Sequence, residues 1–263
     1  MNNVFSFKRF GNYFLFDLRR AFTTYGTNLL VMSLSPAILL VIHLLIGLLK
    51  NGTASELPIE SKFVCLSIVI FVVSVSAGIK IYGSITEKRY GSDFLMLPAS
   101  SFEKWLSMAA VVCVVVPVTL SVVSIASDVL LSLIAPSAYG PSMTSHLLDA
   151  DILGDKEIYI NAPALLYLGW CGCALTFTLG GICFKKAKAA KTFLCLFVLT
   201  TIFTLLLAAT IGDSIDAVPQ LFEDLQDPEQ LINFLNLSAN LFFAVTLGTL
   251  LVLNWFRIRT IKH

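Results

Sequence analysis

The sequence predicts an all-α, polytopic membrane protein with six transmembrane helices. Of its 263 residues, 57% are hydrophobic and only 13% are charged, whereas soluble domains carry about 25% charged residues. The apolar residues also gather in six continuous runs, each long enough to cross a bilayer core as a helix. We expect the whole chain, 1–263, to form a single transmembrane domain.

The first predicted element is an amphipathic helix over 5–22 that lies in the membrane interface. One helical face is apolar and largely aromatic, and most of the basic residues fall on the other. The apolar face holds Phe7, Phe10, Phe14, Leu18, Ala21 and Phe22. We expect this helix to bind membrane lipids, with its cations on anionic headgroups. The alternative is a basic flank that only fixes the topology.

Six predicted spans follow this helix. They cover 27–49, 63–82, 105–134, 163–184, 192–211 and 231–256. Helix start signals support two of these boundaries. Ser100 and Glu103 have the capping-box spacing before the third span, and Pro228 stands at a favoured first helical position before the sixth.

The basic residues predict that both termini are cytoplasmic. Fifteen of the 18 Lys and Arg residues lie near the two termini or in the loops after the second and fourth spans. Only Lys50, Lys62 and Lys156 lie on the other side. Short cytoplasmic loops carry such an excess of basic residues. The formal net charge of only +1 argues against a partner nucleic acid.

Two predicted spans carry a stripe of polar side chains on one helical face. The residues are Ser121, Ser124 and Asp128 in the third span, and Asn233, Asn236 and Asn240 in the sixth. Polar groups inside a membrane are costly and often functional. We expect both stripes to face the bundle interior, where they either line an outward-opening path or form hydrogen bonds between helices.

The sequence holds no recognised motif for catalysis or metal binding. Its three histidines do not form the H-E-x-x-H pattern, and its six cysteines lack metal-ligand spacing. It also lacks the G-x-x-x-x-G-K-[ST] loop that cradles ATP phosphates. We therefore expect no catalytic residue, no metal site and no cofactor on this chain.

The segment 83–104, between the second and third spans, is too polar to cross a membrane. It has a charged start at 87–89, a break at Gly91, an apolar patch over 94–97 and then Pro98. An apolar patch beside charges on a cytoplasmic loop either rests on lipid headgroups or docks into a groove of a soluble partner. The residues alone leave both interpretations open.

Three stretches of this segment resemble the cytoplasmic coupling segment of type-2 ABC exporter permeases. They are Glu87-Lys88-Arg89-x-Gly91, Leu97-Pro98-Ala99-Ser100 and Glu103-Lys104-Trp105-Leu106. The six predicted spans, the interfacial helix and the cytoplasmic termini are also similar to the architecture of that family.

The resemblance implies the permease subunit of an ATP-driven exporter in the cytoplasmic (inner) membrane of a bacterium. It implies that two permease copies, identical or related, form a dimer, and that separate ATP-binding subunits hold ATP and Mg²⁺. The ATPase-coupling residues it implies are Glu87, Lys88, Arg89, Gly91, Phe94 and Leu97. A second hypothesis is a membrane scaffold or sensor that recruits a cytoplasmic partner through 83–104 without transport.

Overall fold

The computed structural model describes residues 5–49, 56–86, 91, 94, 96–148, 162–211 and 228–261. These residues form helices joined by turns, and no strand occurs among them, which confirms the all-α class. In chain order the elements are α1 (Phe7–Ser33), α2 (Ser35–Leu49), α3 (Ile59–Tyr82), the 3-10 turn η1 (Gly83–Thr86), α5 (Ser101–Ala110), the π-helical turn η2 (Val111–Val115), α6 (Val116–Ile134), α7 (Pro136–Tyr139), α8 (Met143–Leu148), α9 (Ala162–Cys183), α10 (Lys188–Ile211) and α12 (Pro228–Thr260).

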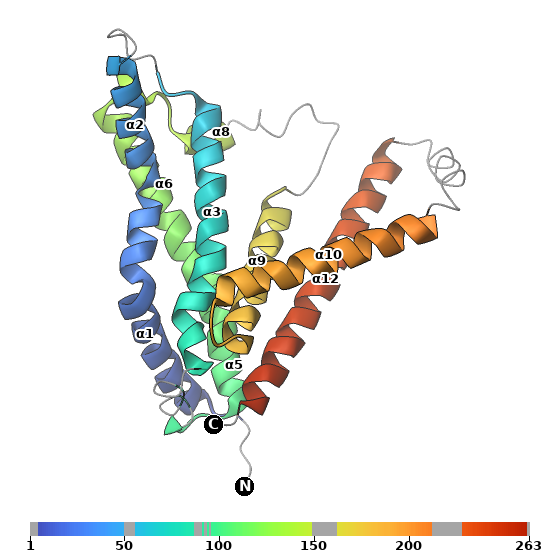
Figure 1. Cartoon of the computed structure of the whole chain (residues 1–263). Helices are drawn as coiled ribbons and strands as arrows, with labels where there is room; N and C mark the ends of the chain where they lie inside the picture. Colours follow the sequence, from blue (N-terminus) through green and yellow to red (C-terminus); the bar gives the residue numbers. More distant parts are fainter. Residues whose placement is uncertain are drawn as a thin grey trace.

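Helices α1, α2, α3 and α6 run between two ends of the molecule, whereas α10 lies obliquely across this direction (Figure 1). The start of α1 and the end of α12 lie at the same end, which we call the terminal end (Figure 1). Helix α2 stops and α3 starts at the opposite end, which we call the distal end (Figure 1). The residues just before α5 also lie at the terminal end, together with both ends of the described chain (Figure 1).

Several helices are long and apolar enough to cross a membrane. Four such stretches are Ile59–Thr86, Ser101–Ile134, Lys188–Leu206 and Asn236–Thr260, and α1 with α2 makes a fifth if this bent pair counts as one. Helix α9 covers the predicted fourth span, although its described apolar stretch, Tyr167–Cys183, is shorter. The described chain is therefore compatible with a multi-pass membrane protein.

Helices α1 and α2 differ from the elements predicted over 5–22 and 27–49. Helix α1 continues through the expected boundary, and the bend of 41° falls at Leu34 instead. The bend lies beside Pro36, which has no N–H to donate into the preceding turn and whose ring crowds that turn. Gly26, near the expected boundary, costs only about 1 kcal/mol inside a helix, so it does not end α1.

The buried face of α1 also differs from the predicted aromatic face. Its buried residues recur every fourth position and are Tyr13, Asp17, Ala21, Tyr25, Leu29 and Ser33. Phe7 and Phe22 are exposed. The inward face therefore combines tyrosines and Leu29 with the smaller Asp17, Ala21 and Ser33. The phenylalanines on the outward face suit contact with lipid.

Helices α3 and α9 form the most extensive helix pair in the described structure. Their backbones approach closely where glycines lie. A Cβ placed on Gly78 would lie 3.0 Å from the Cα of Thr178, and one placed on Gly181 would lie 3.2 Å from the Cα of Ile79. Small residues at helix interfaces allow this close packing within membranes.

An aromatic cluster joins α5 to α12 at the terminal end. The rings of Trp105 and Trp255 lie 6.0 Å apart, and Phe102 lies 5.8 Å from Trp255. The indole Nε1–H of Trp105 donates to the carbonyl of Leu251 at 3.0 Å. Tryptophan is enriched at membrane–water interfaces, and this cluster is compatible with such a position.

Candidate partner-docking site at the terminal end

The Glu103 carboxylate fastens the beginning of α5 to the beginning of α1. Arg9 donates to it through two nitrogens, with Nε 2.7 Å from Oε2 and Nη2 2.8 Å from Oε1. The backbone N–H groups of Ser6 and Ser100 donate to the same carboxylate at 2.9 and 2.8 Å. Such a two-pronged Arg–carboxylate pair is strong and geometrically specific. We call this set of contacts the Glu103 clamp.

The predicted capping box is confirmed and forms part of this clamp. The Ser100 hydroxyl accepts from the Glu103 N–H, and the Glu103 side chain accepts from the Ser100 N–H. Burial alone would raise the pKa of the Glu103 carboxyl, but the hydrogen bonds from Arg9, Ser100 and Ser6 outweigh it and lower the pKa to about 2. The clamp therefore carries its full charge at neutral pH.

A second contact point lies deeper in the bundle, where Asp17 joins three helices. Its Oδ2 accepts hydrogen bonds from the Tyr82 hydroxyl at 2.8 Å and the Ser107 hydroxyl at 2.6 Å. Asp17, Tyr82 and Ser107 belong to α1, α3 and α5, and each is almost fully buried. Buried polar groups need such partners, so this cluster fixes the relative positions of the three helices.

Replacing Asp17 with leucine should lower the free energy of unfolding by about 2–4 kcal/mol, because it leaves two buried hydroxyls without an acceptor. Adding Tyr82→Phe and Ser107→Ala should recover much of the loss, since both donors are then removed. Thermal unfolding of the purified variants measures both effects. A triple variant no more stable than Asp17→Leu alone would contradict this account of the cluster.

Lys104 holds the segment before α5 through two contacts with Phe94. The Lys104 ammonium donates to the Phe94 carbonyl at 2.6 Å and lies 4.7 Å from the centroid of the Phe94 ring. Phe94 itself is buried in the core, and Gly91 is buried as well. Part of the predicted coupling segment is thus packed into the bundle.

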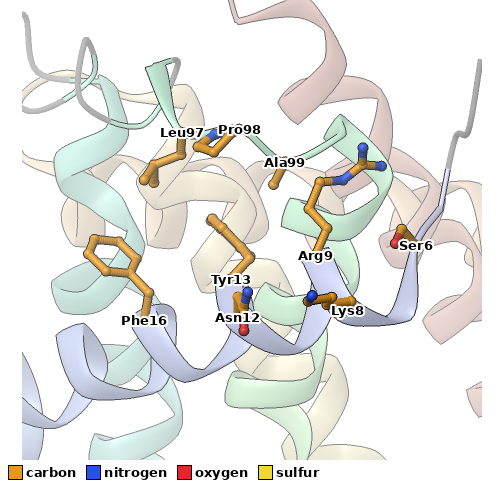
Figure 2. Close-up of a pocket in the computed structure, with 9 residues that line it drawn as sticks. All are labelled: Ser6, Lys8, Arg9, Asn12, Tyr13, Phe16, Leu97, Pro98 and Ala99. Carbon is orange, nitrogen blue, oxygen red and sulfur yellow. The ribbon is translucent and has the colours of Figure 1, made fainter.

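A pocket of about 630 Å³ opens between this segment and α1. Ligand-binding pockets commonly measure about 300–1,000 Å³. The residues lining it are Ser6, Lys8, Arg9, Asn12, Tyr13, Phe16, Leu97, Pro98 and Ala99. Figure 2 shows the side chains of Arg9 and Phe16 rising from α1 toward the 97–99 stretch. The pocket thus combines an apolar wall with cations and hydrogen-bonding groups.

Two exposed apolar side chains lie in the segments that form this pocket: Phe16 lines it, and Met96 directly precedes the lining residue Leu97 in the chain. Met96 is 82% exposed, and Phe16 is 48% exposed. Leu97, one of the predicted coupling residues, lines the pocket itself. An apolar patch with a polar rim at one end of a molecule is typical of a protein-binding surface.

The predicted coupling residues are only partly within the described structure. Glu87, Lys88 and Arg89 lie outside the described residues. Of the others, Gly91 and Phe94 are buried, and Leu97 is the one that reaches the pocket. Sequence reasoning missed the contribution of α1, which supplies most of the pocket lining through residues 8–16.

The two predicted polar stripes do not meet within one chain. Figure 1 shows α3 and α9 between α6, which carries the first stripe, and α12, which carries the second. In the first stripe Ser121 is exposed, while Ser124 and Asp128 are buried. In the second, Asn236 is half-buried and Asn240 is exposed; the side chain of Asn233 lies outside the described residues.

Asp128 holds a compact cap at the distal end. Its carboxylate accepts hydrogen bonds from the Tyr139 hydroxyl at 2.6 Å and from the Met143 N–H at 2.8 Å. The buried Lys62 ammonium donates to the Pro141 carbonyl at 2.8 Å and lies 3.7 Å from the Tyr139 ring centroid. These contacts fix α7 and α8 over the ends of α3 and α6.

The class that these observations define is an all-helical protein with several helices able to span a membrane and a pocket at its terminal end. Among the described residues, no group of His, Cys, Asp or Glu side chains could hold a metal ion. Comparison with protein-family models, curated proteins and solved structures finds no match for this chain.

Proposed function

We propose that this chain is the permease subunit of an ATP-driven exporter of the type-2 ABC class. It crosses the membrane six times with both termini in the cytoplasm, and it forms a dimer with a second, identical or related permease. A separate subunit binds and hydrolyses ATP with Mg²⁺, and it docks on the segment 83–104. No step of ATP chemistry takes place on this chain.

The main support for this proposal is the set of contacts that attach the docking segment, 83–104, to the predicted spans. The Glu103 clamp joins its end to α1, and Asp17 joins α1 to both α3 and α5. A push on residues 96–99 would therefore move three long helices together. Recruitment alone, as in the scaffold hypothesis, does not require such rigid attachment, whereas conversion of nucleotide-driven movement into helix movement does.

The pocket beside this segment supports docking of a folded partner. It lies at the end of the bundle that the basic residues predict to be cytoplasmic, where an ATPase subunit would be. Its apolar wall and exposed Met96 supply contact area, and Lys8 on its rim supplies a charge that favours an acidic partner surface.

A photo-crosslinking residue in place of Met96 tests this proposal in native membranes. We expect an adduct with a protein that contains a G-x-x-x-x-G-K-[ST] loop. The same residue in place of Thr260, exposed at the same end on α12, should give no such adduct. An adduct at Met96 with a protein lacking this loop would favour the scaffold hypothesis, and adducts with lipid alone would overturn docking at this position.

A further inference from the structure

The long helix Ser101–Ile134 contains a local interruption of its backbone hydrogen bonds. At the π-helical turn η2, the Val116 N–H donates to the Val111 carbonyl, five residues earlier. The next residue is Pro117, which has no N–H to donate. The Val112 carbonyl therefore lacks a helical donor, because the Val116 N–H is bonded to Val111 and Pro117 has no N–H. The Cys113 carbonyl loses its α-helical donor, which would come from residue 117.

Helix α9 supplies donors to both carbonyls. The Tyr167 hydroxyl donates to the Cys113 carbonyl at 2.7 Å, and the Trp170 indole N–H donates to the Val112 carbonyl at 3.4 Å. A carbonyl without a donor costs several kcal/mol in a bilayer core, so these two side chains stabilise the interruption. Because these bonds join side chains of α9 to the backbone of the other helix, they can break without unwinding α9 itself.

A further feature that favours bending lies just beyond Pro117. The Thr119 hydroxyl donates to the carbonyls of Val115 and Val116 at 2.8 and 2.9 Å. Hydrogen bonds of this kind from Ser or Thr to the preceding turn tend to bend helices. The stretch from Val111 to Thr119 thus combines a π-helical turn, a proline and a back-bonding threonine, all of which are recognised causes of bending.

The two halves on either side of this stretch are anchored at opposite ends of the molecule, α5 beside the start of α1 and α6 beside its end. The first half, α5, is held to α1 by the Glu103 clamp and to α12 through Trp105. The second half, α6, is held to the distal cap through Asp128, and Ser127 donates to the Ser33 carbonyl at 3.2 Å. A segment that bends easily, between two anchored halves of a helix, is the arrangement of a hinge.

We propose that residues 111–119 are a hinge in this long helix and that Tyr167 and Trp170 of α9 are its latch. With both bonds formed, α5 and α6 hold one relative angle. When the bonds open, the angle varies, and the terminal-end half of the helix moves relative to the distal half. The hinge goes beyond the proposed function, because it holds whether or not the chain exports a substrate.

Distances between spin labels in lipid nanodiscs test the hinge without any partner subunit. Labels on non-canonical residues at Ser101 and Leu133, which are both exposed, flank the hinge and leave the native cysteines in place. Labels at Ser121 and Leu133 lie within α6 and serve as the control pair. The variants are Tyr167→Phe, which removes only the hydroxyl, and Pro117→Ala, which restores a backbone N–H.

We expect Tyr167→Phe to broaden the distance distribution of the 101/133 pair and shift its mean, with the 121/133 pair unchanged. Pro117→Ala should narrow the 101/133 distribution, because the restored N–H would give the Cys113 carbonyl a helical donor. In that background, Tyr167→Phe should have no further effect. Equal distributions in the wild type and both single variants would overturn the hinge, and so would equal broadening of the control pair.

Discussion

Replacing Gly78 with valine is expected to prevent α3 and α9 from packing. A Cβ at position 78 would lie 3.0 Å from both the Cα and the Cβ of Thr178, so the α9 backbone itself would have to move. Overpacking a tight interface costs about 1–3 kcal/mol, and more where the backbone cannot shift. Because these two helices form the most extensive pair, we expect a large loss of monodisperse protein in detergent.

The matched control for this prediction lies on α9. A Cβ added at Gly172 meets nothing within 4 Å, so Gly172→Val makes the same chemical change without the clash. Yield and melting temperature, measured by size-exclusion chromatography after heating, should stay close to wild type for this variant. Equal losses for both valine variants would show that the close α3–α9 approach is not what Gly78 provides.

Replacing Glu103 with glutamine is expected to open the clamp between α1 and α5. The new amide has almost the same shape, but its NH₂ group would face the donors of Arg9, Ser6 and Ser100. Losing a buried, charge-assisted network of this kind costs about 2–4 kcal/mol. The control is Glu60→Gln, because Glu60 is exposed in the first turn of α3 at the distal end.

This loss should depend on pH in one direction. The folded pKa of Glu103 is lowered to about 2, and the carboxyl of an unfolded chain titrates near 4.3. The stabilisation is therefore complete above the unfolded pKa and disappears as the pH falls toward the folded one. The difference in melting temperature between wild type and Glu103→Gln should be constant from neutral to mildly acid pH and should shrink below the unfolded pKa. A difference that grows on acidification would contradict the charged clamp.

The sequence predicted the long helices well, because their signals are local. Continuous apolar runs mark each helix, and the pattern of Ser100 with Glu103 places the start of α5. Pro228 likewise begins α12 as predicted. The exact bend between α1 and α2 was not predicted, although Pro36 carried a usable signal for it.

The candidate site was harder to predict, because its contacts join residues far apart in the chain. Asp17 interrupts the apolar face of an isolated amphipathic helix, and only the proximity of Tyr82 and Ser107 shows why it is there. Tyr13, Asp17 and Ala21 stand at every fourth position, and this spacing was the one available hint that they share a buried face. The pairing of Arg9 with Glu103 spans 94 residues and leaves no pattern in a single sequence.

The contacts of Asp128 were also difficult to predict from the sequence. Asp128 lies near the end of α6, the distal half of the predicted third span. Its partners, Tyr139 and Met143, lie in a short loop that has no hydrophobic periodicity. Ser124 and Asp128 are buried and Ser121 is exposed, so the inward face was predicted only in part, and the cap that Asp128 holds was not predicted.

The most direct test of the central claim is the ATPase activity of the protein purified gently from its native membrane. We predict that a subunit with a phosphate-binding loop co-purifies and hydrolyses ATP. Met96→Asp should reduce that bound activity about tenfold or more, as expected when a charge replaces an apolar contact in the docking surface, while Thr260→Asp leaves it unchanged. Wild-type protein that is folded and dimeric but carries no ATP-hydrolysing subunit would contradict the account.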